Sequence, residues 1–421
     1  MEIITHYGTT FVIIAAVFGF IMAWGIGAND VANAMGTSVG SGVLTIKKAV
    51  LIAMIFEFSG AYLAGGAVTN TVRKGIIDPG LFAHQPQLLV YGMIASLLAA
   101  GAWLLIASYQ GWPVSTTHSI VGAIIGFACV SLGPHAVTWM KVTSIIGSWI
   151  ITPLIAGVIA YFLFTSAQLL IFNNQNPIQA AKRYVPGYMF LAGFVLSLVT
   201  IKKGLSHIGL NFAPSTGYLL AIGIGLSISI VGRLIINRLD IEPNADQQMH
   251  YTNVEKIFAV LMVMTACCMA FAHGSNDVAN AIGPLAAVVS VVSHHGLIAS
   301  STQLAWWILP LGGLGIIAGL AVLGHNVIAT VGKGITHLTP SRGFAAELSA
   351  ASTVVIASGT GLPISTTQTL IGAILGVGMA RGIGALNLGI IRKIIVSWII
   401  TLPAGAVFAI IFYYILLACF Q

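Results

Sequence analysis

Charged residues are scarce in this chain. Of its 421 residues only 6% are charged and ten are acidic, while 57% are hydrophobic; an ordinary soluble domain has roughly 25% charged residues. This scarcity excludes a domain with a water-exposed surface on all sides. Apolar runs of about 20 residues recur along the whole length, and each can cross a hydrocarbon core about 30 Å thick. Ten-residue segments that alternate apolar and polar side chains are absent, which excludes a membrane β-barrel. The sequence therefore predicts a membrane protein of the all-α class.

Cysteine is also rare, and the basic residues are dispersed. The four cysteines lie in or beside apolar segments without the spacing of a metal site, so we expect free thiols. The net charge of +7 comes largely from short basic pairs between apolar runs, which is typical of loops that flank membrane spans. No basic stripe is interleaved with aromatic residues, so a nucleic-acid partner is not expected.

The sequence contains no convincing enzymatic motif, although one nucleophile pattern matches by chance. Residues 36–40 match the Gly-x-Ser-x-Gly nucleophile pattern, but the corresponding segment 283–287 has no serine. That pattern also needs a strand, a turn and a helix around the serine. We therefore predict a protein without catalytic residues, that is not an enzyme and that uses no resident cofactor.

The most informative feature present is a duplicated motif. Residues 27–36 (GANDVANAMG) return as residues 274–283 (GSNDVANAIG), with eight of ten positions identical. A second motif, 111–126 (GWPVSTTHSIVGAIIG), returns as 361–376 (GLPISTTQTLIGAILG), with nine of sixteen identical. The order and the spacing of about 250 residues are preserved, so the chain contains two repeats.

Secondary transporters are often built from repeats that are inverted in the membrane plane and contain broken helices. We predict an all-α polytopic membrane protein with about ten to twelve membrane elements, some broken or re-entrant. The predicted units are 1–165 (first repeat), 166–254 (two further spans and a polar loop) and 255–421 (second repeat). Inversion of the repeats is expected on general grounds.

The first motif places carboxylates and amides at membrane depth. A charged side chain there costs about 2.5–3.5 kcal/mol, so it is rare unless it faces a partner or a cavity. Glycines before each motif predict a locally unwound helix whose carbonyl oxygens join the side-chain oxygens around a small cation, in this interpretation Na⁺. The alternative is simple hydrogen bonding between helices. The candidate ligands are Asn29, Asp30, Asn33, Asn276, Asp277 and Asn280.

The second motif predicts an anion site. Proline at the start of a helix followed by serine and threonine is a capping pattern, and a helix N-terminus with free N–H groups binds anions. Two such turns could surround one tetrahedral oxyanion, with plain helix capping as the alternative. The candidate residues for this site are Ser115, Thr116, Thr117, Ser365, Thr366 and Thr367, together with Asp30 and Asp277.

Two isolated glutamates, Glu57 and Glu347, lie in apolar surroundings. We expect them to bind a cation, to carry protons or to pair with an arginine or lysine at a helix end.

These paired motifs resemble the inorganic phosphate transporter (PiT) family, in particular its compact bacterial members, because no large hydrophilic loop separates the halves. The resemblance covers both repeats. It implies cation-coupled symport of inorganic phosphate, with Na⁺ in some members and H⁺ or a metal–phosphate complex in others. It also implies a transport domain that moves against a scaffold, often in a homodimer, and a multi-pass location in the bacterial inner membrane. Sulfate transport by the same fold is an alternative, and an anion channel or membrane receptor is the alternative from another class.

Electrostatics supports the cation-coupled interpretation. Moving a dianion into a cell against 100 mV costs about 4.6 kcal/mol, and the four motif copies contain no lysine or arginine. Bound cations would supply the missing positive charge. Asparagine oxygens bind metal ions but do not take up protons, which favours Na⁺, whereas Glu57 and Glu347 leave H⁺ possible.

Overall fold

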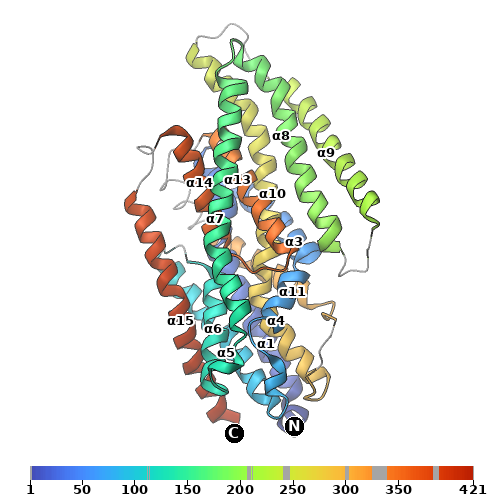
Figure 1. The fold of residues 1–421 in the computed structure, drawn as a ribbon, viewed down its shortest axis with the longest axis vertical. Coiled ribbons are helices and arrows are strands. Elements are labelled where there is room, and N and C mark those ends of the chain that lie inside the picture. Colours follow the sequence, from blue (N-terminus) through green and yellow to red (C-terminus); the bar gives the residue numbers. More distant parts are fainter. Residues whose placement is uncertain are drawn as a thin grey trace.

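The computed structural model describes residues 2–110, 112, 114–205, 210, 212–239, 247–298, 303–324, 339–382 and 388–420. These parts of the chain are almost wholly helical, and their only β pairing is an isolated bridge between Ile77 and Val137. The all-α prediction is therefore confirmed. The helices form one elongated bundle in which the N-terminus and the C-terminus lie at the same end (Figure 1).

The apolar runs form these helices, of which several begin at a proline and several end at a glycine. In the first half the main helices are α1 (Glu2–Asn29), α2 (Val31–Gly40), α3 (Ile46–Ala64), α4 (Gly66–Lys74), α5 (Pro86–Tyr109), α6 (Thr116–Ser131) and α7 (Trp139–Ala167). The middle segment contributes α8 (Pro177–Val199) and α9 (Pro214–Asn237). The second half contains α10 (Gln247–Ser293), α11 (Ile308–Gly319), α13 (Pro340–Gly359), α14 (Thr366–Arg381) and α15 (Leu388–Phe420).

Short helical turns complete the described chain. They are η1 (Pro79–Phe82), η2 (Pro134–Ala136), η3 (Gln168–Phe172), η4 (Thr200–Gly204) and η6 (Leu320–Gly324).

Seven of the described helical segments are long and apolar enough to cross a membrane. The pair α3 and α4 is bent by 64° and forms an eighth span or a re-entrant loop, while Thr116–Ser131 and Ile308–Gly324 are shorter apolar helices. The chain is thus a multi-pass membrane protein with broken or short elements, as expected.

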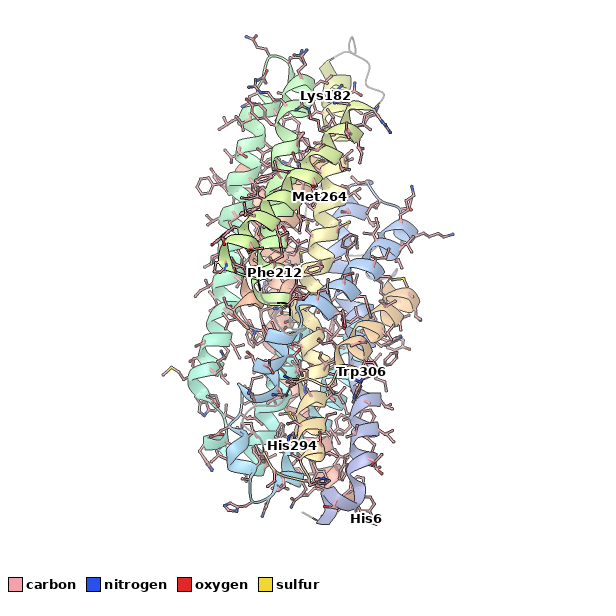
Figure 2. The ribbon with its side chains drawn as sticks, turned by 90° about the vertical axis from the view of Figure 1, so that its right-hand side faces the viewer. His6, Lys182, Phe212, Met264, His294 and Trp306 are labelled. Atoms are coloured by element: carbon pink, nitrogen blue, oxygen red, sulfur yellow. The ribbon has the colours of Figure 1, made fainter. Side chains whose placement is uncertain are left out.

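Helix α10 occupies the centre of the bundle, where it packs against α1, α3, α4, α5, α8 and α13 (Figure 1). Its direction is opposite to that of α1, although the two carry matching motifs. Figure 2 places His6, near the start of α1, at the same end as His294, which follows α10, with Met264 of α10 farther along the axis. This antiparallel relation is the one expected for inverted repeats.

One local expectation was wrong. The second copy of the first motif was expected to unwind its helix, yet α10 runs without interruption through residues 274–283. In the first copy, residues 27–36, only Asp30 separates α1 from α2. The glycines serve close packing instead: a Cβ at Gly274 would lie 2.2 Å from the carbonyl oxygen of Glu57, and one at Gly27 would lie 1.9 Å from that of Ile316. The polar oxygens of this region therefore come mainly from side chains.

The matched helices of the two halves pack crosswise. Helix α6 packs against α15, and its counterpart α14 packs against α7. A Cβ at Gly122 of α6 would lie 2.2 Å from the Leu402 carbonyl oxygen, and one at Gly372 of α14 would lie 2.2 Å from the Pro153 carbonyl oxygen. Because the same glycine meets the corresponding backbone in both pairs, each half completes the helix packing of the other.

Candidate functional site

The two Ser-Thr-Thr turns meet in the interior. Ser115 and Ser365 are the N-caps of α6 and α14, and each hydroxyl accepts a hydrogen bond of 3.3 Å from the backbone N–H three residues later. The Thr117 hydroxyl donates 2.9 Å to the carbonyl of Ile364, the residue directly before the second turn. The capping prediction is thus confirmed, and the two helix N-termini lie beside each other. Their first N–H groups have no partners within the helix.

Both aspartates lie against these turns. The Thr366 hydroxyl donates to Asp277 Oδ2 at 2.7 Å, and the Thr367 hydroxyl donates to Asp30 Oδ1 at 3.4 Å. Both threonine–aspartate pairs are buried, with at most 2% of any of these four residues exposed. Any oxyanion held by the turns would therefore lie next to two carboxylates.

Asn280 joins the second half to the turn of the first. Its amide nitrogen donates to the Thr116 hydroxyl at 3.2 Å and to the Thr117 hydroxyl at 3.1 Å. The Oδ1 atom of the same side-chain amide is buried and has no hydrogen-bond partner among the described residues. The side chain of Asn33, its counterpart in the first half, lies outside the part of the chain that the structure describes.

The first asparagine of each motif makes the same contacts in both halves. Asn29 donates to the Ser108 hydroxyl at 3.0 Å and to the Trp112 carbonyl at 3.4 Å. Asn276 donates to the Ser358 hydroxyl at 3.0 Å and to the carbonyl of Leu362 at 3.3 Å. These contacts hold the segment before each turn in place. The side-chain amide oxygens (Oδ1) of both asparagines are buried without a hydrogen-bond partner in the described chain.

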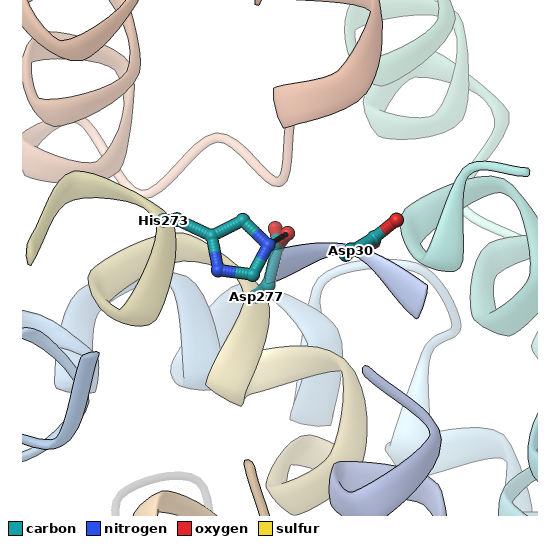
Figure 3. Close-up of side chains that lie close together, drawn as sticks. All are labelled: Asp30, His273 and Asp277. Atoms are coloured by element: carbon teal, nitrogen blue, oxygen red, sulfur yellow. Dashed lines mark ion pairs between the residues drawn. The ribbon is translucent and has the colours of Figure 1, made fainter. Parts of the chain in front are cut away.

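A histidine completes the site. His273 lies one helical turn before Asp277 on α10, and its Nε2 is 2.8 Å from Asp277 Oδ2. Its Nδ1 is 2.8 Å from Glu57 Oε2 on α3. Figure 3 shows the His273 ring beside Asp277, with Asp30 on the neighbouring segment; ligand atoms of these three residues all lie within 4.8 Å of one another. The structure thus brings Glu57 to the site through His273.

Glu347 lies in a separate polar cluster. Its carboxylate accepts hydrogen bonds from Thr37 and from Ser38 (2.7 Å) on α2, and from Thr265 on α10 (2.7 Å). None of these partners belongs to the Ser-Thr-Thr turns or is an aspartate of the motifs. The cluster ties α13 to α2 and α10 in the bundle interior.

Sequence reasoning missed several of these residues. His273 has no polar counterpart, because the matching position in the first repeat is Ile26. Its spacing of four from Asp277 was the one available signal. Ser108, Ser358, Thr37 and Thr265 are single hydroxyl residues in apolar segments, and nothing in the sequence separates them from ordinary helix residues.

Comparisons with known proteins identify the class. Residues 26–409 match the phosphate transporter family. The chain therefore belongs to the phosphate transporter family, and it is a transporter and not an enzyme, as the resemblance of its motifs implied.

Individual relatives agree over nearly the whole length. The chain is 58% identical to a Haemophilus influenzae protein named "Putative phosphate permease", with all of both chains covered. It is 44% identical to "Inorganic phosphate transporter 2-1, chloroplastic" from Arabidopsis thaliana, over 94% of this chain and 71% of that protein. A solved structure titled "The sodium-dependent phosphate transporter" matches with a TM-score of 0.91 and 40% identity, over 97% of this chain and 99% of that chain.

Proposed function

We propose that this protein is a secondary active transporter that carries inorganic phosphate across the membrane together with a cation, with Na⁺ favoured. The main support is the meeting of the two Ser-Thr-Thr turns, joined by the 2.9 Å contact of Thr117 with Ile364. Two duplicated segments, about 250 residues apart in sequence, thus place two helix N-termini at one buried point.

The phosphate-binding residues in this proposal are the six turn residues and the two aspartates. Hydroxyl groups and free N–H groups at two helix N-termini suit a tetrahedral oxyanion. The residues are Ser115, Thr116, Thr117, Ser365, Thr366, Thr367, Asp30 and Asp277. At neutral pH phosphate carries at least one O–H that a carboxylate can accept, whereas sulfate carries none. The neighbouring carboxylates therefore favour phosphate over sulfate.

The proposed cation ligands are the oxygens of the first motif. Asn29, Asn276, Asn280 and Asp277 each present a buried oxygen atom without a hydrogen-bond partner in the described chain, and Asp30 lies beside them. Buried oxygens of this kind are costly unless something compensates them, and a cation would do so. It would also neutralise a dianion, which otherwise meets about 4.6 kcal/mol per 100 mV of opposing potential.

Sodium is favoured because amide oxygens are hard ligands that do not take up protons, and because the similar solved structure is titled as sodium-dependent. Asn33, Glu57 and Glu347 stay predicted cation-binding residues, and H⁺ coupling and a metal–phosphate substrate stay alternatives. A homodimer also stays a prediction. We infer a location in the bacterial inner membrane, in line with the bacterial relative.

Uptake of labelled phosphate into proteoliposomes tests this proposal. With the purified protein, an imposed inward Na⁺ gradient should drive accumulation above equilibrium, and a proton gradient alone should not. Accumulation driven only by protons would replace Na⁺ with H⁺. Flux that equilibrates but never accumulates would indicate a channel, and binding without flux a receptor.

A further inference from the structure

His273 lies between two carboxylates from opposite halves of the chain. Its Nδ1 is 2.8 Å from Glu57 Oε2, and its Nε2 is 2.8 Å from Asp277 Oδ2. All three side chains are fully buried. The Nδ1 contact is a hydrogen bond, whereas the Nε2 contact is a close approach without hydrogen-bond geometry. A carboxylate oxygen on each side of the buried ring gives it one defined orientation.

The carboxylate of Asp277 is held through one oxygen only. Oδ2 contacts both His273 Nε2 and the Thr366 hydroxyl, at 2.8 Å and 2.7 Å. Oδ1 is buried and has no hydrogen-bond partner among the described residues. Two contacts on one oxygen fix the plane of the carboxylate, so the direction of the other oxygen is also fixed.

Glu57 contacts the ring through Oε2, while its Oε1 is buried without a hydrogen-bond partner among the described residues. It is carried by α3, whose backbone is pressed against α10 at Gly274, next to His273 in sequence. The contact of Glu57 with Nδ1 therefore sets the rotation of the imidazole ring relative to a rigid helix pair. In metal sites, carboxylates behind a ligand commonly act in this way, and their removal costs 10–100-fold in metal affinity.

We propose that His273 is a positioning residue for cation binding. Glu57 orients the His273 ring, the ring orients the Asp277 carboxylate, and Asp277 Oδ1 is thereby presented to the co-transported cation. Glu57 then acts through His273 and is not itself a ligand, which differs from its expected role. Only the Asp277 side has this arrangement, because Ile26 occupies the matching place before Asp30. The inference rests on the proposed function.

Three variants test it: His273→Gln, Glu57→Gln and the double variant, each in full-length protein in proteoliposomes. Single substitutions should raise the Na⁺ concentration for half-maximal phosphate uptake about tenfold, with the maximal rate at saturating Na⁺ within about twofold of wild type. The double variant should be no worse than His273→Gln, because both residues act along one chain of contacts. His118→Gln is the matched control, since that buried histidine contacts the Trp398 carbonyl and not the aspartates.

Two results would overturn the inference. If the effects of the single variants multiply in the double variant, Glu57 binds the cation independently. If Na⁺ half-saturation is unchanged in Glu57→Gln, the contact with His273 has no positioning role, even if His273→Gln does not fold. Phosphate uptake that ignores Na⁺ in the wild type would overturn the proposed function as well, whereas Na⁺-dependent wild-type uptake with unaffected variants would overturn this inference alone.

Discussion

The two aspartates have identical neighbours in sequence but different neighbours in space. Asp30 and Asp277 both stand in Asn-Asp-Val-Ala-Asn-Ala. Asp277 is held by His273 and Thr366, whereas the position that matches His273 before Asp30 is an apolar isoleucine. The duplicated halves therefore provide unequal half-sites, because only the Asp277 side has a histidine beside the carboxylate.

Asp277→Asn should reduce phosphate uptake at least tenfold. The substitution removes a buried negative charge that neutralises the co-bound cation, and it places an NH₂ group either at the unpartnered Oδ1 or at Oδ2, which accepts from Thr366. Initial rates of labelled phosphate uptake measure the effect. Asp78→Asn is the control, because Asp78 is an exposed N-cap and asparagine caps equally well. Unchanged uptake in Asp277→Asn would refute the role of this carboxylate.

Thr116→Ala and Thr366→Ala should each raise the apparent KM for phosphate about tenfold or more. A hydrogen bond to a charged group contributes about 1.5–3 kcal/mol, and each substitution removes one hydroxyl from the turns. Uptake as a function of phosphate concentration measures the change. Thr353→Ala serves as control, since that hydroxyl bonds only to its own helix at Ser349. If neither turn variant alters KM, the turns do not bind the anion.

Much of the site could be predicted because its motifs are duplicated in the sequence. Repetition marked the asparagines, aspartates and threonines as a set, and capping chemistry gave the direction of the turns. His273 could not be assigned, since a single histidine has no repeat partner and its two carboxylate contacts come from α3 and from its own helix. The contacts of Asn29 with Ser108 and of Asn276 with Ser358 also depend on packing between distant helices.

At the scale of elements, helices α6 and α14 each pack against a helix of the other half through two glycines, which we call a glycine seam. The seam of α6 is formed by Gly122 and Gly126. The seam of α14 includes Gly372 and Gly376, which lie against the backbone of α7 at Pro153 and Gly157. Close backbone contact of this kind stabilises helix pairs in membranes, where the hydrophobic effect between helices is absent. The seams thus fix the two helix N-termini from which the turns project.

Gly372→Ala should destabilise the protein by about 1–3 kcal/mol, the usual cost of overpacking, because its Cβ would lie 2.2 Å from the Pro153 carbonyl oxygen. We expect a lower thermal unfolding temperature in detergent and a higher KM for phosphate. The control is Gly147→Ala on α7, where a Cβ meets no atom within 4 Å. An unfolding temperature equal to that of wild type would contradict the seam.

The helical class and most spans follow from apolar runs, which leave no other way to satisfy the backbone in a membrane. The continuity of α10 through its glycine-containing motif did not follow. Glycine permits both unwinding and close packing, and the choice depends on the neighbour: here the Glu57 carbonyl, which sequence spacing does not reveal.

At the scale of the molecule, the two repeats are interdependent. We propose the units 1–165, 166–254 and 255–421, with inverted repeats, as suggested by the opposite directions of α1 and α10 (Figure 2). The crosswise pairs α6–α15 and α14–α7 mean that neither repeat can bury its own seam.

Residues 1–165 expressed alone should therefore fail to give a monodisperse protein, and so should residues 255–421. Co-expression of residues 1–239 with residues 247–421 should restore a complex, because every seam can then form. Size-exclusion chromatography in detergent and phosphate uptake measure the outcome. A stable, folded 1–165 fragment would contradict the interdependence of the halves.

The crosswise packing also sets the order of events during biosynthesis. Helices α6 and α7 leave the ribosome well before α14 and α15, and at typical elongation rates the interval is roughly 10–50 s. Throughout that interval the small-residue faces of α6 and α7 have no protein partner and must remain against lipid or an insertion factor. Transport competence therefore arises only when the last helix of the nascent chain has entered the bilayer.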